Sequence, residues 1–152
     1  MKLYLTVGLP ASGKSTFVDK MMEEADEDWV RVNRDDIRRE FFPDPDEPIG
    51  YKFDFKNEDK VTEVAHERMR AAFSEGSNVV CDDTNLSKVA IDSLSLIGAE
   101  FGAQIEINDS FLEVPLLELL ERNRNRERSV PQWVIHRFWD KHVGPKESMK
   151  QM

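Results

Sequence analysis

Short apolar segments alternate with longer amphipathic segments along this chain. The short ones are nearly all apolar, or alternate apolar with polar residues, as strands do: residues 3–7, 29–32, 78–81 and 103–112. The segments between them carry apolar residues at helical spacing, and we expect helices over residues 17–25, 35–42, 61–73, 88–101, 116–123 and 131–142. Gly76 and Gly102 follow two of these segments, where glycine commonly ends a helix.

Strands and helices therefore alternate from the start of the chain. This order predicts an α/β fold, with about four parallel strands in a central sheet and helices on both faces. We find no internal repeat, low-complexity tract or linker, and 152 residues suit a single domain. Ligands of such sheets bind beyond the carboxyl ends of the strands. Three polar segments directly follow predicted strands, so we expect them to form one site: residues 8–16, 33–38 and 82–85.

The composition is that of a globular protein, with 39% hydrophobic and 34% charged residues. Cys81 is the single cysteine, which excludes an intrachain disulfide and suits a small buried apolar side chain. No apolar run approaches the roughly 20 residues of a membrane span, and the chain begins with a strand rather than a signal peptide, so we expect a cytoplasmic protein without a membrane partner. The net charge of −9 disfavours broad nucleic-acid binding. It still leaves room for a small basic site, because salt screens charges beyond about 8 Å.

The segment GLPASGKST, residues 8–16, matches the phosphate-binding pattern G-x-x-x-x-G-K-[ST] and predicts a P-loop NTPase fold. Gly8 and Gly13 let the backbone turn and approach phosphates closely, and the N–H groups of the following helix point at the anion. Lys14 suits the β- and γ-phosphates of a nucleotide, and the Ser15 hydroxyl suits Mg²⁺. We expect the loop to be a surface feature. An ordinary glycine-rich turn is the weaker alternative.

Residues 33–38, NRDDIR, place two carboxylates between arginines. One of them could deprotonate an acceptor hydroxyl near the phosphate loop. Arg38 lies three residues beyond Asp35, so both can share a helix face. An arginine there would keep Asp35 ionised and could bind an anionic acceptor. The alternative is that Asp35 or Asp36 caps a helix and the arginines are solvated.

Residues 82–85, DDTN, follow the third strand. A carboxylate here could hold Mg²⁺, directly or through water, or it could bind the acceptor. Side chains alternate along a strand, so we expect only one of Asp82 and Asp83 to face the site. The alternative is a turn with a polar cap.

Residues 122–128, RNRNRER, are strongly basic. Arg122 and Arg126 are four residues apart, so one helix face could carry both. Such a segment suits a lid-like flap around residues 122–130 that brings positive charge to the transferring phosphoryl group. The alternative is a solvated basic helix end. For the aromatic residues of the last helix, core packing is the expected role and base stacking the minority option: Trp133, Phe138 and Trp139.

The motifs taken together resemble a known family. In order and spacing, G-x-P-x-S-G-K-S-T, N-R-D-D-x-R, D-T-N and R-N-x-x-R followed by V-P are similar to the kinase domain of bacteriophage T4-type polynucleotide 5′-kinases. The resemblance runs from Lys2 to about Val143. It implies transfer of the γ-phosphate of ATP, with Mg²⁺, to the 5′-hydroxyl end of DNA or RNA.

The resemblance also implies a role for each matching residue. Asp35 is the general base on the 5′-hydroxyl, and it acts with Lys14, Arg38 and Arg126. The implied metal ligands are Ser15 and Asp83, the latter directly or through water. The implied donor site comprises Gly8, Pro10, Ala11, Ser12, Gly13, Lys14, Ser15, Thr16, Arg122 and Arg126. The implied acceptor site comprises Arg34, Arg38, Asp83, Thr84 and Asn85.

The sequence departs from the family pattern in two ways. Ala11 stands where the family often has glycine, which is a mild change unless this position needs a positive φ. Many relatives also carry a C-terminal 3′-phosphatase with a D-x-D-x-T motif. This sequence lacks that motif, so we expect no such activity from it, with truncation of a longer protein left open. Residues 144–152 are expected to form a flexible tail.

Two alternatives to a polynucleotide kinase stay open. One is a P-loop kinase of a small metabolite or nucleoside, and the other is a nucleotide-binding regulatory or toxin-like module. Arg34 and Arg38 should form a small cationic mouth for an acceptor, with the acidic DPDEP loop elsewhere. The sequence decides neither DNA against RNA, nor the donor nucleotide, nor the oligomeric state.

Overall fold

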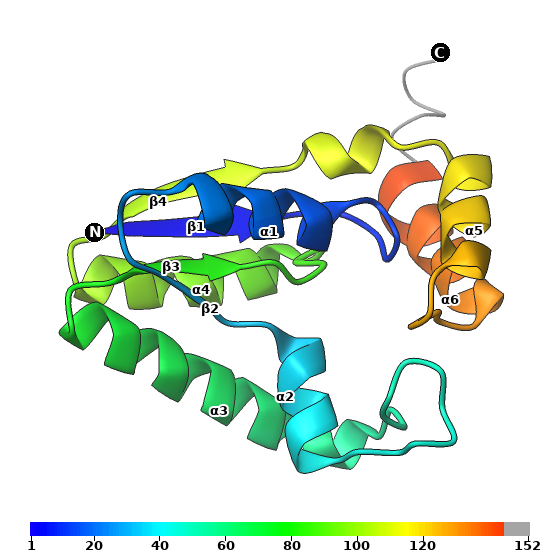
Figure 1. The fold of residues 1–152 in the computed structure, drawn as a ribbon, viewed down its shortest axis with the longest axis horizontal. Coiled ribbons are helices and arrows are strands. Elements are labelled where there is room, and N and C mark those ends of the chain that lie inside the picture. The colour runs from blue at the N-terminus through cyan, green and yellow to red at the C-terminus, as the bar shows by residue number, and fades with distance from the viewer. Residues whose placement is uncertain (145–152) are drawn as a thin grey trace.

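A central parallel sheet organises the molecule. The computed structural model describes residues 1–144. Its four strands are β1 (Lys2–Thr6), β2 (Trp29–Arg31), β3 (Asn78–Cys81) and β4 (Gln104–Asn108). They lie in the order β2-β3-β1-β4, and every neighbouring pair is parallel. The predicted α/β fold class is therefore confirmed (Figure 1).

Helices cover both faces of this sheet. They are α1 (Lys14–Glu24), α2 (Arg34–Phe41), α3 (Phe55–Ser74), α4 (Lys88–Glu100), α5 (Leu116–Asn125) and α6 (Gln132–Phe138). The chain steps outward from β1 to β2 and then back across the sheet. Because such crossovers are right-handed, α1 covers one face while α3 and α4 cover the other (Figure 1). The helices α5 and α6 stand beyond the carboxyl ends of the strands.

One predicted boundary was wrong. The fourth strand was expected to reach residue 112 but ends at Asn108, where the Asn108 side chain accepts from the backbone N–H of Ser110 and starts a 3₁₀ turn, η1 (Ser110–Glu113). The last helix was expected to continue to about residue 142. The chain is helical to Val143, but from Trp139 it takes the wider π form, η2 (Trp139–Val143). A single turn of this wider form is common near functional sites.

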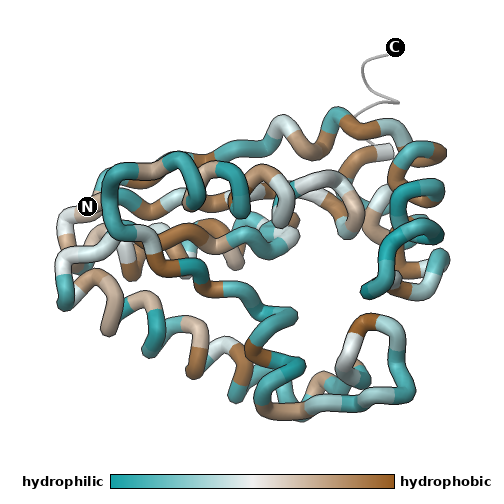
Figure 2. The backbone as a smooth tube through the Cα atoms, viewed as in Figure 1, coloured by the Kyte–Doolittle hydropathy of each residue, from teal (hydrophilic) through white to brown (hydrophobic). Residues whose placement is uncertain are grey.

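The main core lies between the sheet and helices α3 and α4. Leu3 and Leu5 of β1 pack with Val79 of β3 and with Met69 and Phe73 of α3, all of them buried. Each such side chain contributes about 1.5–3 kcal/mol when it leaves water. Brown hydrophobic and teal hydrophilic positions alternate along the helices, as amphipathic helices require (Figure 2). Cys81 is buried in this cluster, as its sequence context indicated.

A second, smaller apolar cluster holds α5 and α6 against the rest of the protein. Its buried members are Leu9, Leu119, Ile135 and Val143. Leu9 belongs to the glycine-rich loop after β1, while the others come from α5, α6 and η2. The cluster therefore packs α5, which carries the first part of the basic segment, onto the loop that was expected to bind phosphates.

The end of the chain and its possible membrane segments were also predicted from the sequence. The tail expected at residues 144–152 lies outside the described residues from position 145 onward. Within residues 1–144, no helix has both the length and the apolar character to span a bilayer.

Candidate active site

One large cleft opens at the carboxyl ends of the strands. Its volume is about 1750 Å³, and its walls come from the loop after β1, from α2 and the residues that follow it, from the end of β3, and from α5 and α6. All three polar segments that follow predicted strands contribute to it, and so does the basic segment. The structure thus brings together residues 8–16, 33–38 and 82–85, which were expected to form one site because each follows a strand.

The glycine-rich loop is shaped by its backbone. A side-chain carbon at Gly8 would lie 2.6 Å from Cβ of Phe111, so only glycine fits between β1 and η1. Gly13 has φ +99°, a conformation that other residues rarely adopt. Ala11 also has a positive φ, of 68°. The backbone of Ala11 is therefore strained, because a positive φ costs an L-residue roughly 1–2 kcal/mol.

Lys14 is a buried residue, contrary to the expectation that the loop is a surface feature. It is 7% exposed, and its Nζ donates to the carbonyl of Leu9 at 2.7 Å. Burial lowers the pKa of Lys14 to about 8, while the negative charge of Asp35 acts in the opposite direction. Lys14 and Asp35 line the same cleft, and the charge of Asp35 favours the protonated amine.

Helix α2 presents the predicted base. The Asn33 side chain caps the helix by accepting from the backbone N–H of Asp36 at 2.9 Å, so neither aspartate serves as the cap. Asp35 accepts from Arg38 Nη1 at 2.8 Å, which confirms that the two share a helix face. Asp35 and Arg38 line the cleft. Asp36 instead pairs with Arg39.

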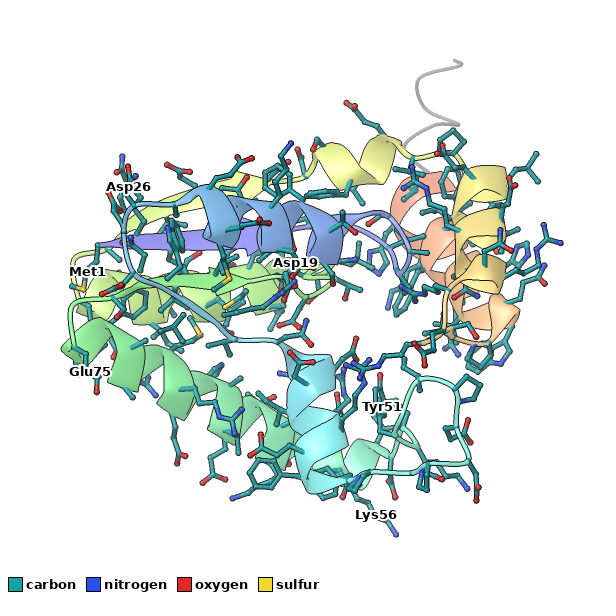
Figure 3. The ribbon with its side chains drawn as sticks, in the orientation of Figure 1. Met1, Asp19, Asp26, Tyr51, Lys56 and Glu75 are labelled. Carbon is teal, nitrogen blue, oxygen red and sulfur yellow. The ribbon has the colours of Figure 1, made fainter. Side chains whose placement is uncertain are left out.

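Tyr51 is a site residue that the sequence gave no reason to single out. Its hydroxyl donates to the Asp35 carboxylate at 2.7 Å (Figure 3 labels Tyr51). The residue lies in the loop between α2 and α3, where a β-bridge to Pro43 and a hydrogen bond from Arg39 to the carbonyl of Ile49 hold the loop against α2. Burial, followed by the charge of Asp35, raises the pKa of Tyr51, so the phenol stays protonated and can donate.

Glu58 of α3 is the second residue that sequence reasoning missed. It accepts from Arg34 Nη2 at 3.3 Å and from Arg38 Nε at 3.1 Å. The expected cationic mouth is therefore neutralised, because its two arginines face Glu58 and Asp35. The acidic loop is not elsewhere either, since Glu47 lines the cleft. An amphipathic helix pattern gives no hint of such a partner, because Glu58 comes from a different helix.

The two aspartates after β3 both line the cleft, although only one was expected to face it. The strand ends at Cys81, so strand alternation does not extend to them. Asp82 is 2% exposed and accepts from Arg31 and from the side chain of Asn33. Asp83 accepts from the backbone N–H of Arg34 at 2.7 Å. Burial raises the pKa of Asp83 to about 7.

Thr84 and Asn85 take part in holding the strand ends together. The carbonyl of Thr84 accepts from the backbone N–H of Gly8 at 3.0 Å. Asn85 is 5% exposed, has φ 43°, and donates its amide to the carbonyl of Thr6 at 2.9 Å. These contacts join the β1 and β3 ends beneath the cleft. The acceptor contacts suggested for both residues stay predictions.

Arg122 and Arg126 of the basic segment both line the cleft, but of the two only Arg122 lies in a helix. Arg122 lies on α5, pairs with Glu118, and comes close to Gly13. Helix α5 ends at Asn125, so Arg126 is extended rather than helical. The two arginines therefore do not share one helix face. Asn123 makes reciprocal hydrogen bonds with the backbone of Val130 and closes the loop between them. Sequence reasoning missed this clamp.

Arg126 lines the cleft and has a buried nitrogen that is unsatisfied. Among buried side-chain nitrogen and oxygen atoms in the described part of the chain, Arg126 Nε is the one without a hydrogen-bond partner. Burial lowers the pKa of Arg126, and the charge of Asp35 acts in the opposite direction. A buried donor without a partner is costly, and a phosphate oxygen would satisfy it.

The residues also fit Mg²⁺ bound together with a nucleotide. In residues 1–144 no cluster of three or more His, Cys, Asp or Glu side chains is placed to hold a metal by itself. Mg²⁺ needs no such cage, because it usually takes one or two protein ligands plus phosphates and water. Ser15 and Asp83 line the same cleft. The negative charges of Asp35 and Asp82 also raise the pKa of Asp83, and a divalent cation would relieve this repulsion.

The fold and the glycine-rich loop define a P-loop kinase-like protein. A family profile described as an AAA domain matches residues 3–145, and the chain belongs to that family.

Two relatives resemble this chain in sequence as well as in fold class or family. L-seryl-tRNA(Sec) kinase of Methanococcus maripaludis is 29% identical over 146 residues, which cover 94% of this chain and 53% of that protein. A chain in a Pnkp1/Rnl/Hen1 RNA repair complex is 30% identical with a TM-score of 0.75, over 99% of this chain and 45% of that one. This chain therefore spans about half the length of these relatives.

A gluconokinase from Sinorhizobium meliloti 1021 has a TM-score of 0.57 at 16% identity, covering 89% of this chain and 71% of its own. At that identity the likeness shows the fold alone.

Proposed function

We propose that this protein is an ATP-dependent kinase that phosphorylates the 5′-hydroxyl end of a nucleic acid. One observation carries the proposal: a carboxylate, Asp35, is held by an arginine and a tyrosine in the same cleft as the phosphate loop and close to Lys14. A motor or switch protein needs a positioned water. A transferase needs a base beside the donor phosphates, with room for an acceptor.

In the proposed reaction, the donor side binds and orients ATP. Lys14 and the N–H groups at the start of α1 would hold the β- and γ-phosphates of ATP. Ser15 and Asp83 would hold Mg²⁺, which when bound would supply positive charge to the phosphates. Arg122 and Arg126 approach the phosphates from the α5 side. Arg126 lines the cleft, where its guanidinium supplies positive charge beside the transferring group.

The acceptor side activates the hydroxyl. Asp35 accepts the proton of the 5′-hydroxyl, the oxygen forms a bond to the γ-phosphorus, and the bond to the β,γ-bridging oxygen breaks to release ADP. Arg38 holds Asp35 and is within the same cleft, where it can bind the first acceptor phosphate. To do so it must exchange part of its pairing with Glu58.

Two further observations favour a nucleotide-bearing acceptor over a small metabolite. Trp133 was expected in the core, but it is 63% exposed and lines the cleft, where an indole face suits a nucleobase. In addition, the relatives above 25% identity carry names that concern RNA, a seryl-tRNA kinase and an RNA repair complex. Those names describe the relatives, and for this chain they support the proposal only as a likeness.

The test is transfer of labelled γ-phosphate to defined acceptors. We expect a nucleoside 3′-monophosphate and a 5′-hydroxyl oligonucleotide to be phosphorylated, and a bare nucleoside to be poor. Gluconate and seryl-tRNA serve as the competing acceptors. Preferential use of gluconate or of a bare nucleoside would support a metabolite kinase, and preferential use of seryl-tRNA would move the acceptor hydroxyl from the 5′ end to an aminoacyl group. ATP binding without transfer to any hydroxyl would favour a regulatory module.

A further inference from the structure

The loop that leads into α3 exposes two aromatic rings at the edge of the cleft. Phe53 is 50% exposed and Phe55 is 83% exposed, and both line the cleft. Their ring centroids are 4.9 Å apart in an edge-to-face arrangement. Exposing a large apolar ring to water forfeits the free energy that burial would provide, so neighbouring exposed rings beside a site indicate a ligand surface.

These rings are continuous with the proposed acceptor site. The Arg38 guanidinium lies 5.9 Å from the centre of the Phe53 ring and 5.5 Å from that of Tyr51. Arg38 also pairs with Asp35, the proposed base. Arg38 therefore lies beside both the carboxylate and the Phe53 ring, so a phosphate bound at Arg38 would lie next to this aromatic pair.

The charge pattern of the segment suits a nucleic-acid strand. The sequence from Tyr51 reads YKFDFK, in which basic residues flank the aromatic ones. Lys52 lines the cleft, whereas Lys56 projects away from it (Figure 3). Asp54 is occupied as the N-cap of α3, where it accepts from the backbone N–H of Lys56. What the segment offers the cleft is therefore two aromatic faces and a cation, the combination that binds single strands by stacking and phosphate contact.

We infer that Phe53 and Phe55 form a stacking subsite for the second nucleobase of the acceptor, with Lys52 beside its phosphate. The inference rests on the proposed function and narrows its substrate class: the preferred acceptor is a single-stranded 5′-hydroxyl end of at least two nucleotides. A fully paired blunt end keeps its second base stacked in the duplex and cannot use the subsite.

The test uses two acceptors that carry the same number of phosphates. One is a 5′-hydroxyl dinucleotide with a 3′-phosphate, and the other has an abasic second unit. We expect the abasic acceptor to be used about 5- to 150-fold less well in kcat/KM, the range that a single stacked base provides. Phe55→Ala should remove most of this difference, and Phe55→Trp should restore it.

Phe41→Ala is the matched control, because Phe41 is 42% exposed on α2 outside the cleft lining. It should leave the ratio between the two acceptors unchanged. An equal loss in Phe41→Ala, or no difference between the two acceptors in the unaltered protein, overturns the stacking subsite. If the nucleoside 3′-monophosphate is used but the second base adds nothing, the inference fails alone. If no nucleotide acceptor is used at all, the proposed function fails with it.

Discussion

The two sides of the cleft are built in opposite ways. The centre of the donor side is one continuous segment, residues 8–16, whose shape comes from backbone conformation at Gly8, Ala11 and Gly13. The acceptor side is assembled from side chains on separate elements, and Asp35, Tyr51 and Glu58 meet there through Arg38. The donor side therefore depends on particular residues at fixed spacing along the sequence. The acceptor side depends on side chains from distant parts of the sequence that the fold brings together.

The charged groups of the two sides also differ in their partners. On the donor side, the Lys14 amine contacts the Leu9 carbonyl and the Ser12 hydroxyl, and Arg126 Nε has no partner. On the acceptor side, the arginines are already matched by carboxylates. Phosphates of a nucleotide thus meet Lys14, whose amine contacts neutral groups, although Arg122 is paired with Glu118. An acceptor must compete with Asp35 and Glu58 for Arg38. We expect donor binding to depend on charge more strongly than acceptor binding does.

The largest effect should come from breaking the donor side at Lys14. Lys14→Ala removes the amine that contacts the transferring phosphates, and phosphoryl transfer should fall by about 10³-fold, the upper range for one preorganised donor. Lys20→Ala, on the exposed part of α1, is the control and should retain activity. Because Lys14 is buried, the thermal midpoint of both variants must be measured alongside transfer. A folded Lys14→Ala protein with nearly normal turnover would contradict the assignment of the loop.

The next largest effect should come from the acceptor side at Asp35. Asp35→Asn keeps the shape of the side chain but cannot take up a proton, so kcat should fall by at least about 10²-fold. Asp36→Asn is the matched control, because Asp36 pairs with Arg39 and does not line the cleft. The rate of single-turnover transfer with saturating ATP is measured for both variants. A similar fall in kcat in the two variants would contradict the assignment of Asp35, and not Asp36, as the base.

A smaller effect is expected from the hydroxyl of Tyr51. Tyr51→Phe keeps the ring against Arg38 but removes the hydrogen bond that orients Asp35, so kcat should fall by about 5- to 20-fold with KM for ATP unchanged. Tyr4→Phe controls for loss of a hydroxyl, since Tyr4 bonds Asn108 away from the cleft. A rise in KM for ATP without a change in kcat would show that the loop supports the donor side instead.

The smallest effect concerns strain in the donor loop. Ala11→Gly should raise the free energy of unfolding by about 0.5 kcal/mol, because relief of the positive φ slightly exceeds the added flexibility of the unfolded chain. Ala25→Gly is the control, since Ala25 has φ −76° and should only lose stability. Denaturant unfolding of the two variants measures the difference. Destabilisation at both positions would mean that the strain at Ala11 is repaid by contacts of its methyl group.

The prediction of the fold succeeded because it depended on local patterns. Apolar segments at strand length separated by helical spacing fixed the α/β class, and the strand-end rule grouped residues 8–16, 33–38 and 82–85 into one cleft. The Asp35–Arg38 pair could be expected as well, because a helix places residues three apart on the same face. The polynucleotide acceptor and the residue roles stay predictions, since neither the geometry nor the comparisons test them.

The sequence by itself determined the phosphate loop, the sheet and the location of the site, because each follows from contacts between residues close along the chain or from the common direction of parallel strands. Only the tertiary structure decided what surrounds the acceptor. Tyr51 and Glu58 reach Asp35 and Arg38 across loop and helix boundaries, and Phe53 and Phe55 are exposed because the loop bends back toward α2. Such meetings depend on packing over long sequence separations, which no local pattern encodes.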